Sequence, residues 1–229
     1  GDSAPDRWGR VLMRRAARRQ AEAESQTPPT LLEMDYLLGV NDEARQGALR
    51  FADTPDGPFL ADRTASSVPP LVELPRLLSA AERLAEDEDT EEDLLLLLAP
   101  GSSLGGARPK ASVREADGGL AIAKFPHKND EFPTNKWEAV ALTLAAGAGI
   151  PTPDWRLENI AGKDVTILRR FDRDGDKRIP FLSAMSMIGA KDNEEHSYLE
   201  IADALRQYGA APKNDRAALW RRIVFNILI

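Results

Sequence analysis

The sequence contains no cysteine and only two histidines, His127 and His196. The first absence excludes disulfide bonds and thiolate catalysis, and it is compatible with a reducing compartment, so we expect a cytoplasmic location. The second excludes a histidine-rich metal site. Long apolar stretches are also missing: the leucine-rich run 94–99 is far too short to cross a bilayer. We therefore expect no membrane partner, and we predict a buried strand at this run.

Positive charge is in deficit, because 30 lysines and arginines are outnumbered by 37 aspartates and glutamates, giving a net charge of -7 and a pI near 5.1. This balance argues against a protein that binds nucleic acid over its whole surface. It does not exclude a local basic patch, and the sequence contains one. It comprises Arg7, Arg10, Arg14, Arg15, Arg18 and Arg19. We interpret the patch as a solvated helix face, with a nucleic-acid contact as the alternative.

Apolar periodicity and turn residues predict a mixed chain of the α+β class. Helices are expected at 5–23 (capped by Asp6), from 30 to a left-handed cap at Gly39, and at 71–84, 134–146 (capped by Thr134), 198–208 and 216–229. Strands are expected at 46–51, 94–99, 111–113, 119–125, 155–160 and 165–170, with turns at 117–119 and 161–164. The acidic run 86–93 is a solvated connection or a helix start.

A candidate phosphate site lies in the middle of the chain. Glycines at 101, 105 and 106 let a backbone approach an anion closely, and successive amides of such a loop can bind phosphate oxygens. Lys124 follows on an apolar strand, where its ammonium needs an anionic partner. Glu138, on the next helix, is the natural one. Each piece alone has an ordinary explanation, a tight turn or a lysine reaching water, and no Walker motif closes the loop.

Several blocks resemble one family in order and in residue type. They are 101–113 (GSSLGGARPKASV), 121–126 (AIAKFP), 137–150 (WEAVALTLAAGAGI) and 169–173 (RRFDR), together with 1–10 and the Leu-Leu-Gly…Gly-Ala-Leu pattern at 37–49. These blocks are similar to the HipA family of toxin–antitoxin Ser/Thr kinases. The resemblance implies a protein-kinase-like fold, with an N-terminal subdomain at 1–98, a small β-rich nucleotide-binding lobe at 99–175 and the start of a helical lobe at 176–229.

The resemblance also implies a site for ATP and Mg²⁺. Lys124 corresponds to the family's phosphate-pairing lysine, and Glu138 corresponds to its partner on the helix. The positions of the phosphate loop correspond to Gly105, Gly106, Ala107, Arg108, Pro109 and Lys110. The adenine edge would meet backbone groups of Arg169, Arg170 and Phe171, although the family often has glutamate where Arg169 stands. Ser103 falls at the autophosphorylated position, where a phosphate would repel those of ATP. An ordinary loop hydroxyl is the alternative.

The implied activity is transfer of the ATP γ-phosphate to a protein serine or threonine, with an aminoacyl-tRNA synthetase as the family's target. A DNA-binding antitoxin of the HipB type is the implied partner, and the protein would contact nucleic acid only indirectly, through that antitoxin. The family's Asp-x-His-x-x-Asn loop would follow Ile229. We therefore expect both ends of the chain to be cuts in a longer protein, with no catalytic residue or metal ligand in this part, which alone would be inactive.

Three carboxylates, Asp172, Asp174 and Asp176, could suggest a metal site, but neighbouring cations favour a surface turn. Two other interpretations stay open. One is a non-catalytic interaction module that docks an antitoxin or partner subunit. The other is an unrelated ATP-grasp-like or metabolite enzyme, because a loop followed by a lysine is not unique to kinases.

Overall fold

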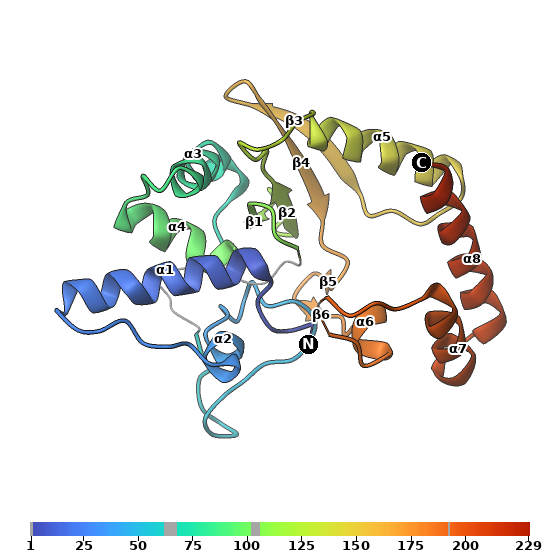
Figure 1. Ribbon diagram of the computed structural model, residues 1–229, viewed down its shortest axis with the longest axis horizontal. Helices are drawn as coiled ribbons and strands as arrows, with labels where there is room; N and C mark the ends of the chain where they lie inside the picture. Colours follow the sequence, from blue (N-terminus) through green and yellow to red (C-terminus); the bar gives the residue numbers. More distant parts are fainter. Residues whose placement is uncertain (1, 62–67, 102–105, 192) are drawn as a thin grey trace.

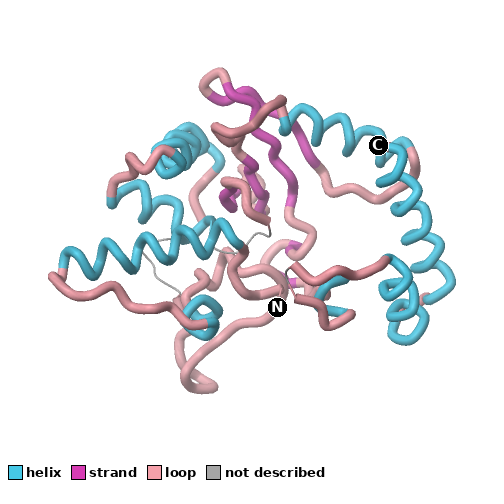
Figure 2. Tube along the Cα trace, in the orientation of Figure 1, coloured by secondary structure: helices cyan, strands magenta, loops and turns pink. Residues whose placement is uncertain are grey.

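A computed structural model of the protein describes residues 2–61, 68–101, 106–191 and 193–229. Helices and a small sheet are combined, which confirms the α+β class. Figure 1 shows a sheet at the centre, with α1, α3 and α4 on one side and α5 on the other. Helices α7 and α8 form a separate arm beyond α5. The same division into helical flanks and a central sheet is visible in the tube of Figure 2.

The sheet has four antiparallel strands in the order β1-β2-β4-β3. They are β1 (Lys110–Arg114), β2 (Leu120–Lys124), β3 (Trp155–Ile160) and β4 (Lys163–Arg169). Gly118 and Gly162 adopt φ angles of +85° and +83° at the two hairpin turns, a conformation that glycine takes without strain. The predicted strands and turns of this region are therefore confirmed.

Side chains alternate between the two faces of the sheet, as a strand requires. One face carries buried Ala123, Phe125 and Ile167, which pack with leucines of α1 (Arg7–Ala23), α3 (Leu74–Ala85) and α4 (Glu91–Gly101) in the main core. The opposite face carries Lys110 and Lys124, which lie directly across from each other in the β1–β2 register. Helix α5 (Thr134–Gly147) lies against β3 and β4.

The leucine-rich run is part of helix α4, so the prediction of a strand at 94–99 was wrong. Thr90 and Asp93 exchange hydrogen bonds at the helix start, from the Thr90 amide to Asp93 Oδ2 (2.9 Å) and from the Asp93 amide to Thr90 Oγ1 (3.2 Å). The acidic side chains of the first turn interact favourably with the positive end of the helix dipole, so the acidic run is a helix start. Leu94 and Leu97 are buried while Leu95 is 62% exposed, as helical spacing requires.

Other local predictions had mixed outcomes. Asp6 caps α1, since its Oδ1 accepts a hydrogen bond from the Gly9 amide at 2.6 Å. The predicted strand at 46–51 is absent, because this segment is irregular. Gly39 has a φ of -77° and is no left-handed cap, and α2 (Glu33–Leu38) begins later than expected. Thr134 is the first helical residue of α5 rather than its cap.

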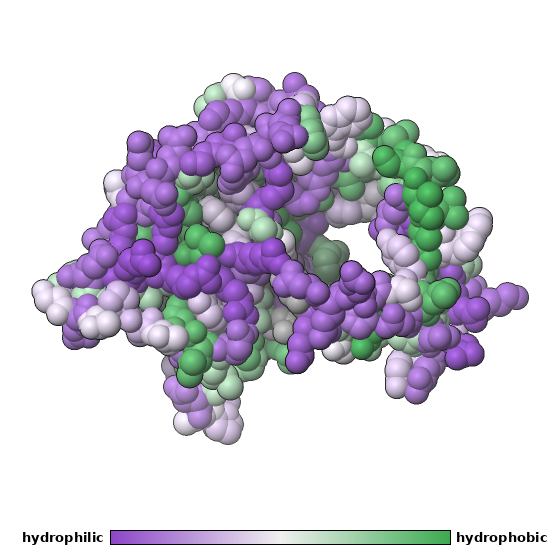
Figure 3. Space-filling view, in the orientation of Figure 1, coloured by the Kyte–Doolittle hydropathy of each residue, from purple (hydrophilic) through white to green (hydrophobic). Residues whose placement is uncertain are grey.

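Small elements that the pattern did not predict complete the chain. A short 3₁₀ turn, η1 (Leu71–Glu73), precedes α3, and β5 (Arg173–Asp174) pairs with β6 (Lys177–Arg178). Helix α6 (Ala184–Met187), also not predicted, leads to α7 (Tyr198–Tyr208) and α8 (Pro212–Leu228), which confirm the two predicted helices of this region, although α8 begins earlier than expected. In Figure 3 an opening separates α8 from the central part of the molecule. Within the described ranges, no helix is long and apolar enough to cross a membrane.

Three of the six arginines in the basic patch of α1 are paired with acidic side chains. Arg15 and Arg19 bind the buried carboxylate of Asp89, and Arg10 forms a bidentate pair with Glu33. These contacts join α1 to the segments around it. For these three arginines they favour a structural role over the contact with nucleic acid that the sequence left open.

Candidate functional site

The structure brings Lys124 and Glu138 together, as the sequence predicts. Lys124 ends β2, and its Nζ forms an ion pair with Glu138 Oε1 on α5. The two side chains are 35% and 26% exposed, so the pair is partly buried and still reaches solvent. A lysine in this position presents a point charge of fixed direction.

Asn135 fixes the helix that carries Glu138. Its side chain is buried, and Nδ2 donates to the Lys124 carbonyl (3.1 Å) and to the Asp164 carbonyl (2.6 Å). Thr166 on β4 donates from Oγ1 to the Asn135 carbonyl at 3.4 Å. The first turn of α5 is therefore attached to both β2 and β4. Because Glu138 lies one turn further on, the same attachment sets its position opposite Lys124.

The candidate phosphate loop is described from Gly106 onward; Ser103 and Gly105 lie outside the described residues. Gly106 has a φ of +87°, which a residue with a side chain adopts only with strain. Ala107 and Arg108 are exposed, and Arg108 forms an ion pair with Asp130. Pro109 is buried, and its carbonyl accepts a hydrogen bond from the Phe125 amide at 3.0 Å. The loop therefore enters the sheet beside the strand that carries Lys124.

Lys110 differs from the other cations of the loop because it is only 4% exposed. Its Nζ lies 3.1 Å from Asp6 Oδ2. Burial lowers the pKa of the Lys110 ammonium; Asp6 opposes this effect, and the charges of Lys124 and Arg108 add to it, so the pKa lies below its usual value. Three cations thus converge at the loop, and one of them is enclosed by protein.

The predicted adenine segment lies where β4 leaves the sheet. The Arg169 amide donates to the Asp154 carbonyl (2.8 Å) and the Arg170 amide to the Leu120 carbonyl (2.9 Å), so both donors are engaged within the protein. Phe171 is 60% exposed and meets Phe181 edge to face, with ring centroids 5.1 Å apart. Of the three residues, Arg170 is buried, Arg169 is exposed and paired with Asp117, and Phe171 presents an exposed aromatic ring.

Comparison with family models gives a match to the HipA-like C-terminal domain over residues 102–229. This match covers more than half of the chain. The chain therefore belongs to the HipA-like C-terminal domain family. The matched region of this HipA-like chain includes the loop, Lys124, Glu138 and the segment that follows β4. None of the curated proteins compared with the chain matches it.

The side chain of Arg170 has a structural role in this HipA-like domain. It is buried, and its Nη1 donates to the Ala44 carbonyl (2.8 Å) and to Ser112 Oγ (3.2 Å). Nε and Nη2 hold Asp172 at 2.8 and 2.7 Å. Asp172 is therefore buried, and the prediction that it belongs to a surface turn was wrong.

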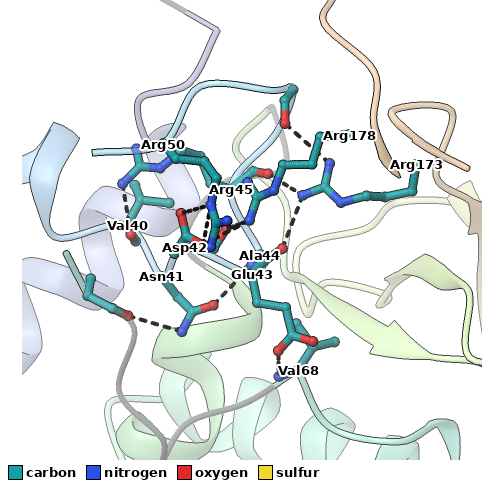
Figure 4. A network of polar contacts seen from close by, with 12 residues as sticks. Val40, Asn41, Asp42, Glu43, Ala44, Arg45, Arg50, Val68, Arg173 and Arg178 are labelled. Atoms are coloured by element: carbon teal, nitrogen blue, oxygen red, sulfur yellow. Dashed lines mark hydrogen bonds and ion pairs between the residues drawn. The ribbon is translucent and has the colours of Figure 1, made fainter. Parts of the chain in front are cut away.

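Asp172 is part of a wider network that the sequence did not reveal. Figure 4 shows the arginines of this network around the segment 40–45. Three arginines converge on the segment 40–45. Arg173 of β5 donates to the Arg45 carbonyl (2.7 Å), and Arg178 of β6 donates to the Asp42 carbonyl (2.7 Å). Arg50 donates to the Asp42 carboxylate (2.9 Å). Arg45 itself is fully buried, and burial lowers its pKa to about 10. This network joins the N-terminal segment to the strand end after β4.

The site fits the phosphates of a nucleotide better than it fits a metal. A positive-φ glycine and half-exposed cations suit phosphate oxygens. Among the described residues, however, no group of three or more histidines, aspartates or glutamates could hold a metal ion. No step of the chemistry is therefore assigned to Mg²⁺ in this part of the protein.

Proposed function

We propose that this chain is the nucleotide-binding part of a HipA-like Ser/Thr protein kinase with a protein-kinase-like fold. The observation that supports this most directly is the Lys124–Glu138 ion pair beside the Gly106 loop. In phosphoryl transfer the protein acts mainly by positioning charge, and a lysine held by a glutamate from a packed helix is a recurring arrangement for that purpose.

Each group has a role in this proposal. Backbone amides from Gly106 to Arg108 approach the phosphates, Arg108 and Lys124 neutralise them, and Glu138 sets the direction of the Lys124 ammonium. Backbone groups and the exposed Phe171 ring meet the adenine. Transfer of the γ-phosphate to a serine or threonine needs a carboxylate that orients the hydroxyl, which the resemblance puts outside this sequence. We expect the 229-residue chain alone to bind ATP without transferring phosphate.

The wider assignments follow from the resemblance. They comprise Mg²⁺ as the companion of ATP, autophosphorylation of Ser103, an aminoacyl-tRNA synthetase as the protein substrate, a DNA-binding antitoxin of the HipB type as the partner, and a cytoplasmic location. Phosphate on Ser103 would repel the phosphates of ATP from the loop, which gives autophosphorylation an inhibitory direction.

Ligand-dependent thermal stabilisation tests nucleotide binding. A ligand at a hundredfold its dissociation constant stabilises by about 2.7 kcal/mol, which raises the melting temperature of a chain of this size by about 5–11 °C. We expect that rise with ATP and magnesium, and its loss in Lys124→Ala. Lys163→Ala is the matched control, because Lys163 lies on β4 of the same sheet and forms a part-exposed ion pair with Glu82 of α3. An equal rise in Lys124→Ala and wild type would contradict the proposal.

A non-catalytic docking module is the second candidate, favoured by exposed apolar side chains. Trp137, Val140 and Leu144 follow one face of α5 at helical spacing and are 59%, 45% and 45% exposed. Trp220 on α8 is 67% exposed. Tight binding of a HipB-type antitoxin, lost in Trp137→Ala and unaffected by Lys124→Ala, with no response to ATP, would favour this function.

A further inference from the structure

The first turn of α1 contacts the candidate phosphate loop at its C-terminal end. Asp6 uses both carboxylate oxygens: Oδ1 caps α1 by accepting from the Gly9 amide, and Oδ2 holds Lys110 Nζ at 3.1 Å. Trp8 binds the main chain of the same lysine, since its Nε1 donates to the Lys110 carbonyl at 2.9 Å in a buried setting. Lys110 is thus held at its side chain and at its backbone by one helical turn.

The same turn also contacts the segment where the loop begins. Gly101 is the last residue of α4, and a Cβ atom there would lie 3.0 Å from Trp8 Nε1 and 2.7 Å from Leu12 Cδ1. It would also lie 3.4 Å from the Lys110 carbonyl oxygen. Both ends of the connection between α4 and β1 therefore meet on the side chain of Trp8.

The described part of the loop lies close to this anchor. A Cβ atom on Gly106 would lie 3.7 Å from Lys110 Nζ, and Lys110 is directly opposite Lys124 in the β1–β2 register. The Lys110 ammonium therefore lies next to the loop backbone at Gly106, with no room for more than one further carbon atom between them. Because Lys110 is enclosed and already paired, it influences a phosphate through the position of the loop.

We propose that Asp6 and Trp8 are positioning residues of the phosphate loop. They hold Gly101 and Lys110, so that the backbone amides from Gly106 to Arg108 face the phosphates of a nucleoside triphosphate. This inference rests on the proposed function, because it assigns a support to the same site. Positioning within a fraction of an ångström matters for such a loop, since several weak hydrogen bonds to one anion must form together.

The test compares ATP with adenosine by calorimetry on the whole chain. Asp6→Asn keeps the helix cap, because asparagine caps as well as aspartate does, and it removes the charge opposite Lys110. We expect ATP to bind about tenfold more weakly, since a hydrogen bond to a charged group is lost, while adenosine affinity stays unchanged. Trp8→Phe keeps an aromatic ring and removes the Nε1–H donor, and we expect it to weaken ATP binding as well. Glu33→Gln is the control, because Glu33 pairs with Arg10 of the same turn away from the loop.

A double variant separates positioning from stability. Asp6→Asn leaves an unpaired buried lysine, which lowers the melting temperature. Adding Lys110→Met removes that charge, so the melting temperature recovers. If Asp6 positions the loop, ATP affinity stays low in the double variant and equals that of each single variant, because the two residues act as a pair. Recovery of ATP affinity together with the melting temperature would reduce Asp6 to a structural role and overturn the inference.

The outcomes also separate this inference from the proposed function. If the wild-type chain does not bind ATP, both the proposed function and this inference are overturned. Wild type that binds ATP, with binding lost in Lys124→Ala and retained at full strength in Asp6→Asn, leaves the proposed function intact and overturns the role of Asp6.

Discussion

Asp172 is the carboxylate on which the buried arginine network depends, and its replacement by asparagine is a sharp test of the fold. The Asp172 side chain is 1% exposed and accepts hydrogen bonds from Arg170, from Arg173 Nη1 (2.7 Å) and from the Gly47 amide (2.8 Å). Asp172→Asn keeps the shape. It removes the charge and directs an amide NH₂ group toward donors, so Arg170 and Arg173 stay buried without their anion.

The expected cost is large because the arginines cannot reach water. Their side chains are 1% and 8% exposed. Removing one partner of a buried ion pair costs about 3–5 kcal/mol, a large part of the 5–15 kcal/mol that stabilises a typical domain. At about 2–4 °C for each kcal/mol in a chain of this size, the melting temperature should fall by about 6–20 °C.

The loss should depend on pH in a defined direction. Burial raises the pKa of the Asp172 carboxyl, but hydrogen bonds and charge from Arg170, the Gly47 amide and the charge of Arg173 outweigh it, so the pKa lies below the ordinary value of 3.8. A carboxylate with a lowered pKa in the folded state contributes stability above its unfolded pKa and loses it as the pH falls through the folded one. The gap between wild type and Asp172→Asn should be constant above about pH 5 and should narrow below about pH 4.

Thermal denaturation followed by circular dichroism between pH 3 and 8 measures both effects. Asp117→Asn is the matched control, because Asp117 pairs with Arg169, the neighbour of Arg170, at the surface (48% and 54% exposed). A surface pair contributes little, so this variant should melt near wild type. If the two variants melt at the same temperature, the network does not carry the stability assigned to it.

Two further pairs of substitutions test the packing around the sheet by the same denaturation assay. Gly101→Ala should destabilise by about 1–3 kcal/mol because its Cβ would meet Leu12 and Trp8, whereas Gly147→Ala, at the last residue of α5 with nothing within 4 Å, should stabilise by about 0.5–1 kcal/mol. Leu97→Ala, at a fully buried position of α4, should cost about 2–5 kcal/mol, against little change in exposed Leu95→Ala; equal losses would contradict the helical assignment of this run.

The hairpins and the Lys124–Glu138 pair could be predicted because their signals are local. Short alternating runs end at glycine-containing turns, and a strand lysine precedes a helix glutamate by 14 residues. The leucine run failed for the opposite reason: five consecutive identical residues have no period, so neither helix nor strand is favoured. The deciding signal was the cap formed by Thr90 and Asp93 just before it.

The network around Asp172 and the Asp6–Lys110 pair could not be predicted from local pattern. Asp6 and Lys110 are 104 residues apart, and Arg170 and Ala44 are 126 residues apart. An arginine that will be buried against carbonyl groups has the same sequence appearance as one that stays in water. The fold alone distinguishes them, because the cost of burial depends on partners from distant segments.

The exposure of the three loop cations limits how the proposed site can bind a triphosphate. Each cation already has one carboxylate: Lys110 has Asp6, Lys124 has Glu138 and Arg108 has Asp130. Phosphates must therefore compete with carboxylates for these charges. Lys124 and Arg108 are 35% and 43% exposed and can reach an incoming anion while they keep part of their present contact, whereas Lys110, at 4%, cannot turn outward without leaving Asp6. In the proposed site, direct neutralisation of the phosphate charge thus falls to Lys124 and Arg108. Lys110, which the resemblance placed among the phosphate contacts, would instead support the loop.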